Sequence, residues 1–208
     1  QVEKEVLAQQ NGVAGGAAPP SQETGKALSL IIDEAEEAID NSDFVLAKKL
    51  FESALDIGKG SQEKVTCTND AYLIQRLAMA TYKARQPDKI KALNDALALL
   101  YKLDLEHTND AETVSLAGAI EKKLYEEGEG LEHLSNAILY FQRGYYLLNN
   151  RYNAINLAFA LNCRANSPLC TTKEEQIADM IYANYTRKRV LYLCNKDWED
   201  ITKRESKE

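Results

Sequence analysis

The chain has 208 residues, 45% of them hydrophobic and 27% charged, which is typical of a globular protein rather than a disordered one. Its net charge of −7 argues against broad binding of nucleic acid, because that binding needs Lys and Arg to neutralise phosphates. The sequence contains neither a secretory signal nor an apolar run of about 18 residues that would predict a membrane span. We therefore expect a cytoplasmic protein that binds neither nucleic acid nor membrane.

The chain is expected to divide into a helical domain and two ends. Residues 11–20, NGVAGGAAPP, have the composition of a flexible linker, so 1–20 is predicted to be a flexible N-terminal segment. The helical domain is predicted over 21–195, followed by a polar C-terminal tail at 196–208. Because the chain begins with Gln rather than Met, we expect it to be a piece of a longer protein.

From Ser21 onward, the pattern of apolar residues predicts helices joined by short connections. The scarcity of Pro, with 4 residues, and of Gly, with 10, favours long helices over a turn-rich β fold. Ser21 is expected to cap the first helix, Pro87 to lie in the first turn of the fourth, and Thr171 or Thr172 to form a capping box for the eighth. The predicted helices span 21–41, 43–58, 69–85, 87–103, a segment from the HTND cap at 107–110 to 126–130, 131–148, 151–166, and a last one ending near 194.

The spacing of small residues in the helix pairs resembles that of the tetratricopeptide repeat. Ala35 is followed by Ala47, Phe51 and Ala54, the small and aromatic positions at which the two helices of such a repeat touch. The later pairs keep this chemistry with longer insertions, in the sets Ala78, Ala92, Ala96 and Leu99; Gly118, Ala137, Phe141 and Gly144; and Ala158, Ala178, Tyr182 and Tyr185. The predicted fold is all-α, an α-solenoid of antiparallel helix pairs with degenerate repeats, and the alternative is an unrelated α bundle.

Three segments in order resemble the TRAFs-binding domain over about 110–165. The family shows a Leu-x-Gly motif, an aromatic-rich Arg-Gly segment, and a Tyr-x-x-Ile-Asn-x-Ala motif. In this chain they correspond to Leu116 and Gly118; to Phe141, Arg143, Gly144 and Tyr145; and to Tyr152, Ile155, Asn156 and Ala158. The family usually has Gly where this chain has Ala154.

The resemblance implies a helical region that regulates through protein contact, as in the central part of apoptosis signal-regulating kinases and in many bacterial proteins. We expect a non-catalytic scaffold for protein–protein interaction or for intramolecular regulation of a signalling or effector protein. Its partner would be an adaptor, an effector or an adjoining domain. The alternative is a ligand-sensing regulatory domain of a larger bacterial signalling or defence enzyme, with a pocket lined by Tyr82, Lys122 and Arg164.

One amide, Asn156, lies among the apolar residues of the helix at 151–166. A buried amide needs hydrogen-bond partners, so we expect Asn156 to clamp backbone carbonyls near Leu148, and direct contact with a ligand is the alternative. Helical spacing places Phe141 and Tyr145 on one face and turns Tyr146 away from it, toward the surface. The residues expected to have structural roles are Gly118, Phe141, Gly144, Tyr152, Ile155, Asn156 and Ala158.

The candidate partner-binding residues lie mainly on the first helix of each pair. They are Gln75, Tyr82, Lys83, Lys122, Asn162 and Arg164, together with Tyr146 on the sixth helix. The Lys and Asn clamp with which tetratricopeptide arrays hold a C-terminal carboxylate is absent from the corresponding positions, so the sequence does not predict a receptor for chaperone tails.

No set of residues predicts catalysis, a cofactor or a metal. The sequence has no nucleotide-binding loop, no HExxH and no GxSxG motif, and its two histidines, His107 and His133, are expected at exposed helix ends. The four cysteines form no CxxC motif and are expected to be free thiols, although Cys163 and Cys170 are near enough in sequence for a disulfide. We therefore expect a protein that is not an enzyme.

Overall fold

The computed structural model describes residues 22–60, 67–168 and 172–205, which form eight helices. In chain order these are α2 (Gln22–Asp40), α3 (Phe44–Gly60), α4 (Cys67–Ala84), α5 (Lys89–Tyr101), α6 (Ala111–Glu126), α7 (Leu131–Leu148), α8 (Arg151–Ala165) and α9 (Lys173–Glu205). No strand occurs in the described part of the chain, so the prediction of an all-α fold is confirmed. Ser21 and Thr171, two of the expected caps, lie outside it.

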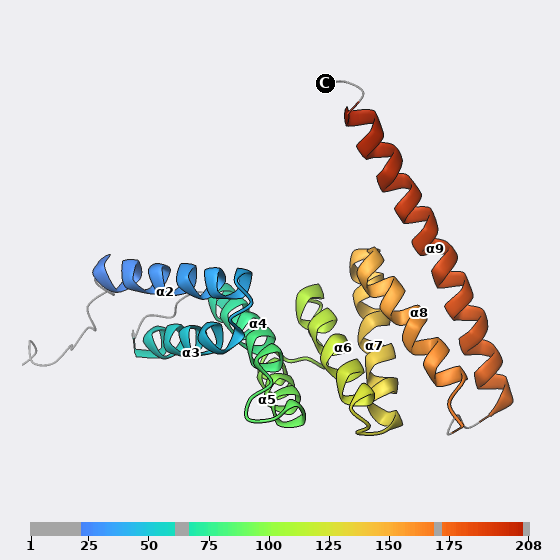
Figure 1. Ribbon diagram of the computed structural model, residues 1–208, viewed down its shortest axis with the longest axis horizontal. Helices are drawn as coiled ribbons and strands as arrows, with labels where there is room; N and C mark the ends of the chain where they lie inside the picture. Colours follow the sequence, from blue (N-terminus) through green and yellow to red (C-terminus); the bar gives the residue numbers. More distant parts are fainter. Residues whose placement is uncertain (1–21, 61–66, 169–171, 206–208) are drawn as a thin grey trace, which may run out of the picture.

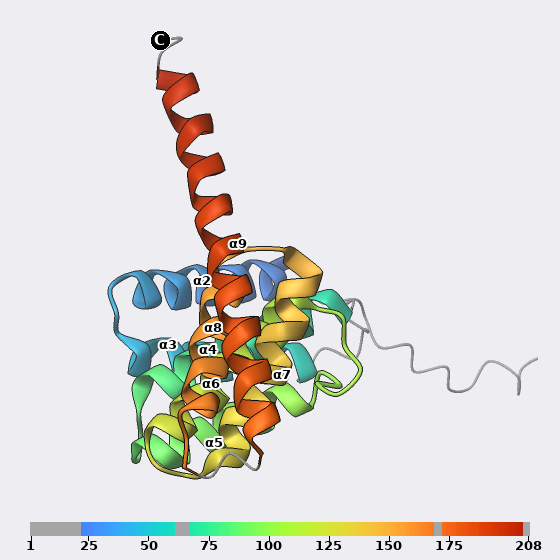
Figure 2. The same cartoon turned by 90° about the vertical axis from the view of Figure 1, so that its right-hand side faces the viewer.

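The helices pack as four consecutive pairs: α2 with α3, α4 with α5, α6 with α7, and α8 with α9. In Figure 1 the pairs follow one another along the long axis of the molecule, from α2 and α3 at one end to α8 and α9 at the other. The view in Figure 2, turned by 90°, places the pairs one behind another, with α9 extending beyond them. This arrangement is the predicted α-solenoid of helix pairs.

Small side chains lie at the helix crossings of the first two pairs. Ala35 of α2 and Ala47, Phe51 and Ala54 of α3 are completely buried, as the first repeat predicts. Ala78, Ala92 and Ala96 of the second pair are also completely buried. Small residues let two helix backbones approach closely, and Phe51 fills the space that remains between them.

Polar residues define several helix ends. Asp88 and Asp110 cap α5 and α6, where their carboxylates accept hydrogen bonds from the backbone N–H groups of Lys91, at 2.8 Å, and Thr113, at 2.7 Å. Pro87, expected inside the fourth helix, instead precedes the Asp88 cap. The cap itself determines this start, since the side chain of Asp88 already satisfies one of the free N–H groups of the first turn.

Two consecutive asparagines form the turn between α7 and α8. Asn149 ends α7 in the left-handed conformation, with φ of 46°, and its N–H donates to the carbonyl of Tyr145 at 2.7 Å. Asn150 then caps α8, because its side chain accepts a hydrogen bond from the N–H of Asn153 at 2.9 Å. Asn tolerates the left-handed region better than most residues, which explains why the turn needs no glycine.

Helix α9 differs most from the sequence prediction. It was expected to end near residue 194 but runs to Glu205, and it begins after Thr172, whose hydroxyl accepts from the N–H of Glu175 at 3.1 Å. None of the described helices, this one included, is long and apolar enough to cross a membrane.

The face of α9 that packs on α8 also differs in part from the prediction. Of the three residues expected at the contact, Tyr182 packs against the core of α7 and α8, but Ala178 and Tyr185 are exposed, and Asp179, Ala183 and Thr186 are buried. The Thr186 hydroxyl is satisfied within the helix by donating to the carbonyl of Tyr182 at 2.8 Å. Two of these three buried residues are polar. The spacing of apolar residues in the sequence therefore did not predict this face of α9.

The loop between α5 and α6 joins the two halves of the solenoid and is held by Arg143 of α7. The guanidinium of Arg143 donates to the backbone carbonyls of Leu105 at 3.1 Å, Glu106 at 2.9 Å and Thr108. Leu105 itself is completely buried in the core around α5 and α6. The arginine of the Arg-Gly segment therefore fixes a loop of the fold.

Candidate functional site

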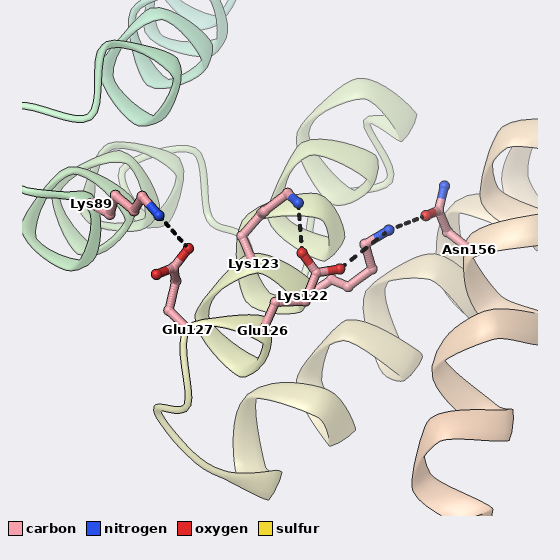
Figure 3. Close-up of polar contacts among 6 residues, drawn as sticks. All are labelled: Lys89, Lys122, Lys123, Glu126, Glu127 and Asn156. Carbon is pink, nitrogen blue, oxygen red and sulfur yellow. Dashed lines mark hydrogen bonds and ion pairs between the residues drawn. The ribbon is translucent and has the colours of Figure 1, made fainter.

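Polar contacts connect the first helices of successive pairs, and we call the surface that carries them the first-helix face. Between α2 and α4, the Glu36 carboxylate accepts from the Tyr72 hydroxyl at 2.6 Å and forms an ion pair with Arg76. Between α6 and α8, the Lys122 ammonium donates to the side-chain oxygen of Asn156 at 2.8 Å (Figure 3). These contacts fix the register of neighbouring helices along one side of the solenoid.

Gln75 supplies the corresponding contact between α4 and α6. Its amide nitrogen donates to the carboxylate of Asp110 at 2.6 Å and to the hydroxyl of Thr113 at 2.9 Å. Asp110 is the cap of α6, so Gln75 ties the second helix pair to the start of the third. The sequence placed Gln75 among the candidate partner-binding residues, and its side chain is already engaged inside the molecule.

The contacts of Asn156 differ from the sequence prediction. Its amide nitrogen donates to the carbonyl of Tyr152, one turn back in α8, at 2.9 Å, and not to carbonyls near Leu148. The Asn156 side chain is only half-buried, and Lys122 approaches it from α6. The residue therefore joins two helices at the surface rather than clamping the end of α7.

The amide that is completely buried is Asn153, one turn earlier in α8. Its nitrogen donates to the hydroxyl of Ser115 in α6 at 2.9 Å, whereas its oxygen has no hydrogen-bond partner within the described part of the chain. Gly144 of α7 lies directly against it, and a Cβ atom on Gly144 would stand 2.9 Å from the carboxamide. Asn153 thus links α6, α7 and α8, a role that the sequence analysis did not assign to it.

Three large apolar side chains of α8 stay half-exposed, and we call them the α8 patch. Tyr152 is 51% exposed, Ile155 46% and Phe159 44%. Tyr152 contacts the buried Phe141 edge-on, with 6.3 Å between ring centroids, and the Lys122 ammonium lies 5.0 Å from the Phe159 ring centre. Ile155 was expected in the packed face of the helix, but its exposure places it in this patch.

A second surface feature lies where the ends of α4 and α6 meet the start of α5. It is a pocket of about 160 Å³, which we call the basic pocket, lined by Tyr82, Lys83, Arg85, Lys89, Leu93, Lys123 and Glu127. Burial, with smaller effects of Tyr152 and Glu112, raises the pKa of Tyr82 to about 12, so its hydroxyl stays protonated at neutral pH. The ammonium of Lys83 lies 5.5 Å from the ring centre of Phe44 and 5.7 Å from that of Tyr82.

The three residues expected from the sequence to line a ligand pocket, Tyr82, Lys122 and Arg164, make different contacts in the structure. Of these three residues only Tyr82 lines the basic pocket. Arg164 instead pairs with Asp179 of α9 through two hydrogen bonds of 2.7 and 2.9 Å. Asn162, which also lies on α8, is half-buried.

Tyrosines from α7 and α9 line a third, more open hollow. Its volume is about 390 Å³ and its lining consists of Tyr145, Tyr146, Asn149, Tyr182 and Tyr185. The hydroxyls of Tyr146 and Tyr182 are 2.9 Å apart, and this hydrogen bond lowers the pKa of Tyr146, while burial raises that of Tyr182. Tyr146 is highly exposed, in keeping with its expected turn away from Phe141, which is completely buried.

A buried carboxylate connects α6 to α7. Glu121 is 1% exposed, and its oxygens lie 2.6 Å from Nδ1 of His133 and 3.3 Å from the amide nitrogen of Asn136, which donates to it. Burial raises the pKa of Glu121 despite these contacts, each of which acts in the opposite direction. His133, expected at an exposed helix end, is instead partly buried and has a buried acidic partner 12 residues away in sequence.

The remaining residues of the structural set lie at helix crossings. A Cβ atom on Gly118 would stand 3.0 Å from the Phe141 ring, so α6 and α7 approach closely there. Ala158 is completely buried, and its carbonyl accepts from Arg187 of α9 at 3.4 Å. The contact of Gly118 with Phe141 is of the kind that the repeat pattern predicts for small residues.

Acidic, histidine and cysteine side chains do not gather into a metal site anywhere in the described residues, where no group of three or more of them is close enough to hold an ion. Cys163 and Cys194 are free thiols, and burial raises the pKa of Cys163. The side chains of Cys67 and Cys170 lie outside the described part. The possible disulfide between Cys163 and Cys170 therefore also falls outside it.

Comparison with known families supports the reading of the fold. The family model Tetratricopeptide Repeats-Sensor, TPR-S, matches residues 43–161, from the start of α3 to most of α8. A comparison with curated proteins gives no match. The TPR-S match covers more than half of the 208 residues and includes the contacts that connect α4, α6 and α8. The chain therefore belongs to the TPR-S family of helical-repeat domains.

Proposed function

We propose that this domain is a non-catalytic scaffold that binds a protein partner at the α8 patch. The observation that carries the proposal is the exposure of Tyr152, Ile155 and Phe159, three large apolar side chains on one face of α8. Clustered apolar and aromatic groups of this kind are typical of protein-binding surfaces, because covering them removes apolar area from water. Tetratricopeptide-like repeats suit the role, since a solenoid presents an extended surface on rigid helices.

The contacts behind the patch support a binding surface that is already ordered. Tyr152 rests against Phe141, and Lys122 is held by Asn156 on one side and lies over Phe159 on the other. Side chains that are fixed before association lose less conformational freedom when a partner binds. The patch can therefore contribute affinity without rearrangement of α8.

The partner class follows from the resemblance to the TRAFs-binding domain. That resemblance supports a regulatory region that recruits an adaptor or contacts an adjoining effector domain of a signalling protein. We extend the proposal accordingly, to regulation by protein contact inside a longer signalling protein, with no cofactor and no reaction of the domain's own.

The test uses a photo-crosslinking amino acid placed at Phe159 or, as a control, at Leu139, an exposed residue of α7 outside the patch. A protein crosslinked from Phe159 and not from Leu139 is then purified and titrated with the domain. Ile155→Ser and Phe159→Ser should weaken this binding by about tenfold or more each, and Leu139→Ser should leave it unchanged. Equal crosslinking from both positions, or binding that neither patch variant weakens, would contradict the proposal.

Ligand sensing is the second candidate function, and the basic pocket is the observation that favours it. The family description names a sensor, and a cavity of about 160 Å³ beside Tyr82 offers a place for a small ligand. The two functions use different surfaces, so a ligand in the basic pocket leaves the α8 patch available to a partner.

A further inference from the structure

The basic pocket concentrates positive charge in a protein whose net charge is −7. Four of its seven lining residues are cationic, namely Lys83, Arg85, Lys89 and Lys123, and one is acidic, Glu127. We propose that this pocket binds a compact dianion of the phosphomonoester class. This inference goes beyond the protein-binding function and rests on ligand sensing, the second candidate, for which it names the ligand chemistry.

The cationic groups of the pocket are engaged only weakly. Lys89 of α5 reaches the carboxylate of Glu127 at 3.4 Å, and Lys123 of α6 reaches that of Glu126 at 2.6 Å (Figure 3). Both pairs are substantially exposed, and exposed ion pairs hold their members loosely because water screens them. An incoming anion can therefore recruit both ammonium groups without breaking a buried contact.

Arg85 is the most informative residue of the pocket. Its guanidinium has neither an ion pair nor a hydrogen bond with any other residue of the described part of the chain. Its backbone has φ of 55°, a left-handed conformation that costs free energy for a residue with a Cβ atom and that glycine would adopt readily. At this position the chain carries a free guanidinium, the group best shaped to bind phosphate oxygens in pairs.

The size and lining of the pocket favour a phosphomonoester over a simple carboxylate. A carboxylate has one charge and two oxygens, whereas a phosphomonoester has up to two charges and three oxygens for the four cations to share. The pocket volume of about 160 Å³ is several times the roughly 30 Å³ that one water molecule occupies in the liquid, which leaves room for a phosphate and part of its organic group. The Tyr82 ring and Leu93 provide a less polar wall for that group.

Glu127 acts as an internal competitor for the site. The carboxylate of Glu127 already accepts from the ammonium group of Lys89. A phosphate that binds to Lys89 therefore has to displace the Glu127 carboxylate. Lys83 lies in the last turn of α4 and Arg85 directly follows that helix, Lys89 opens α5, and Lys123 and Glu127 lie at the end of α6. A dianion bound among them would therefore connect the second helix pair to the third and stabilise the junction between them.

The experiment titrates the purified protein with phenyl phosphate and, separately, with a short phosphoserine peptide, by calorimetry at low ionic strength. Arg85→Gly removes the guanidinium and relieves the left-handed strain, so it should fold at least as well as the parent while weakening binding by about tenfold or more. Lys123→Gln should also weaken binding. Lys91→Gln, which removes an exposed lysine of α5 that pairs with Asp95 outside the pocket, is the matched control and should bind like the parent.

Glu127→Gln tests the competition directly and should tighten binding several-fold, whereas Glu129→Gln, which changes an exposed residue that does not line the pocket, should leave binding unchanged.

Binding of phenyl phosphate with this pattern identifies a small metabolite as the source of the dianion. Binding of the phosphopeptide alone, with the same pattern, identifies a phosphorylated protein segment. Absence of saturable binding by both probes, or equal weakening by Lys91→Gln and Arg85→Gly, would overturn the inference. Sensing itself fails separately if phosphate binds in the pocket but leaves amide hydrogen exchange at the junction of the second and third helix pairs unchanged.

Discussion

Gly144 of α7 and Asn153 of α8 approach each other so closely that a Cβ atom on the glycine would stand 2.9 Å from three atoms of the Asn153 carboxamide. The carboxamide has little freedom to retreat, because Asn153 is completely buried and donates to Ser115 at 2.9 Å. The glycine of the Arg-Gly segment is therefore explained by contact across two helices.

We expect Gly144→Ala to destabilise the protein by about 1–3 kcal/mol, the usual cost of forcing an extra methyl group into a packed core. The clash outweighs the gain of up to about 1 kcal/mol that alanine brings to the interior of a helix. The measurement is the free energy of unfolding in urea.

Gly25→Ala is the matched control, since nothing lies within 4 Å of a Cβ atom built on Gly25 in α2. This substitution should stabilise by about 0.5–1 kcal/mol, so the same chemical change has the opposite sign at the two positions. Equal stabilisation by both variants would show that the Asn153 side chain moves aside.

The two asparagines of α8 should differ sharply in their importance for stability. Asn153→Ala removes a buried amide and leaves the Ser115 hydroxyl without its donor, which should cost about 2 kcal/mol. Asn156→Ala should cost less than about 1 kcal/mol, because Asn156 is half-buried and water can replace it beside Lys122. Thermal melts of the two variants side by side test this difference, and a larger loss in Asn156→Ala would restore the structural role that the sequence suggested for it.

The sequence predicted the architecture well because small residues at helix crossings leave a regular pattern. The spacing of Ala35, Ala47, Phe51 and Ala54 identified a helix pair, and all four are completely buried. The same reasoning missed part of the buried face of α9, where the buried positions include a charged residue, Asp179, that pairs with Arg164.

The candidate site was less predictable, because its contacts join residues that are far apart in sequence. Lys122 and Asn156 are 34 residues apart, and Gln75 and Thr113 are 38 apart. No local pattern marks such pairs. Arg85 shows a different difficulty, since its left-handed backbone conformation becomes evident only in the structure. The sequence predicted a buried amide at Asn156, but the buried amide is Asn153, one turn earlier. This difference also depends on a contact between separate helices, that of Gly144 with Asn153.

Stability should depend on pH through the buried Glu121. Burial raises the pKa of its carboxyl above the ordinary value of 4.5, so the folded state holds the proton more tightly than the unfolded state does. The resulting stabilisation is fully present below pH 4.5 and is lost as the pH rises through the folded-state pKa. Because glutamine does not titrate, the stability of Glu121→Gln relative to the parent should increase from pH 4.5 to 7.

Urea unfolding at several values of pH measures this difference, and Glu129→Gln, an exposed residue, should show a flat difference over the same range. His133→Ala should make the parent's loss of stability steeper, because the His133 contact favours the charged carboxylate and lowers its pKa. A difference between Glu121→Gln and the parent that stays constant with pH would contradict the proposed titration.

The last prediction concerns the ion pair between Arg164 of α8 and Asp179 of α9. The Asp179 side chain is only 8% exposed and accepts both hydrogen bonds from the guanidinium, at 2.7 and 2.9 Å. Arg164→Met would leave this carboxylate buried without the pair, which should cost about 3 kcal/mol in the free energy of unfolding. The sequence, in contrast, placed Arg164 among the candidate partner-binding residues.

The double variant Arg164→Met/Asp179→Leu separates the loss of the pair from the burial of a lone charge. Replacing both members by apolar residues should return the stability to within about 1 kcal/mol of the parent, because neither charge then has to be desolvated. Arg151→Met provides the control at the same interface: Arg151 pairs with Asp197 of α9 at 3.0 Å, but both side chains are exposed, so the loss should stay below about 1 kcal/mol. If Arg164→Met unfolds like Arg151→Met, the pair contributes little to the packing of α9 on α8, and partner binding becomes the better explanation for Arg164.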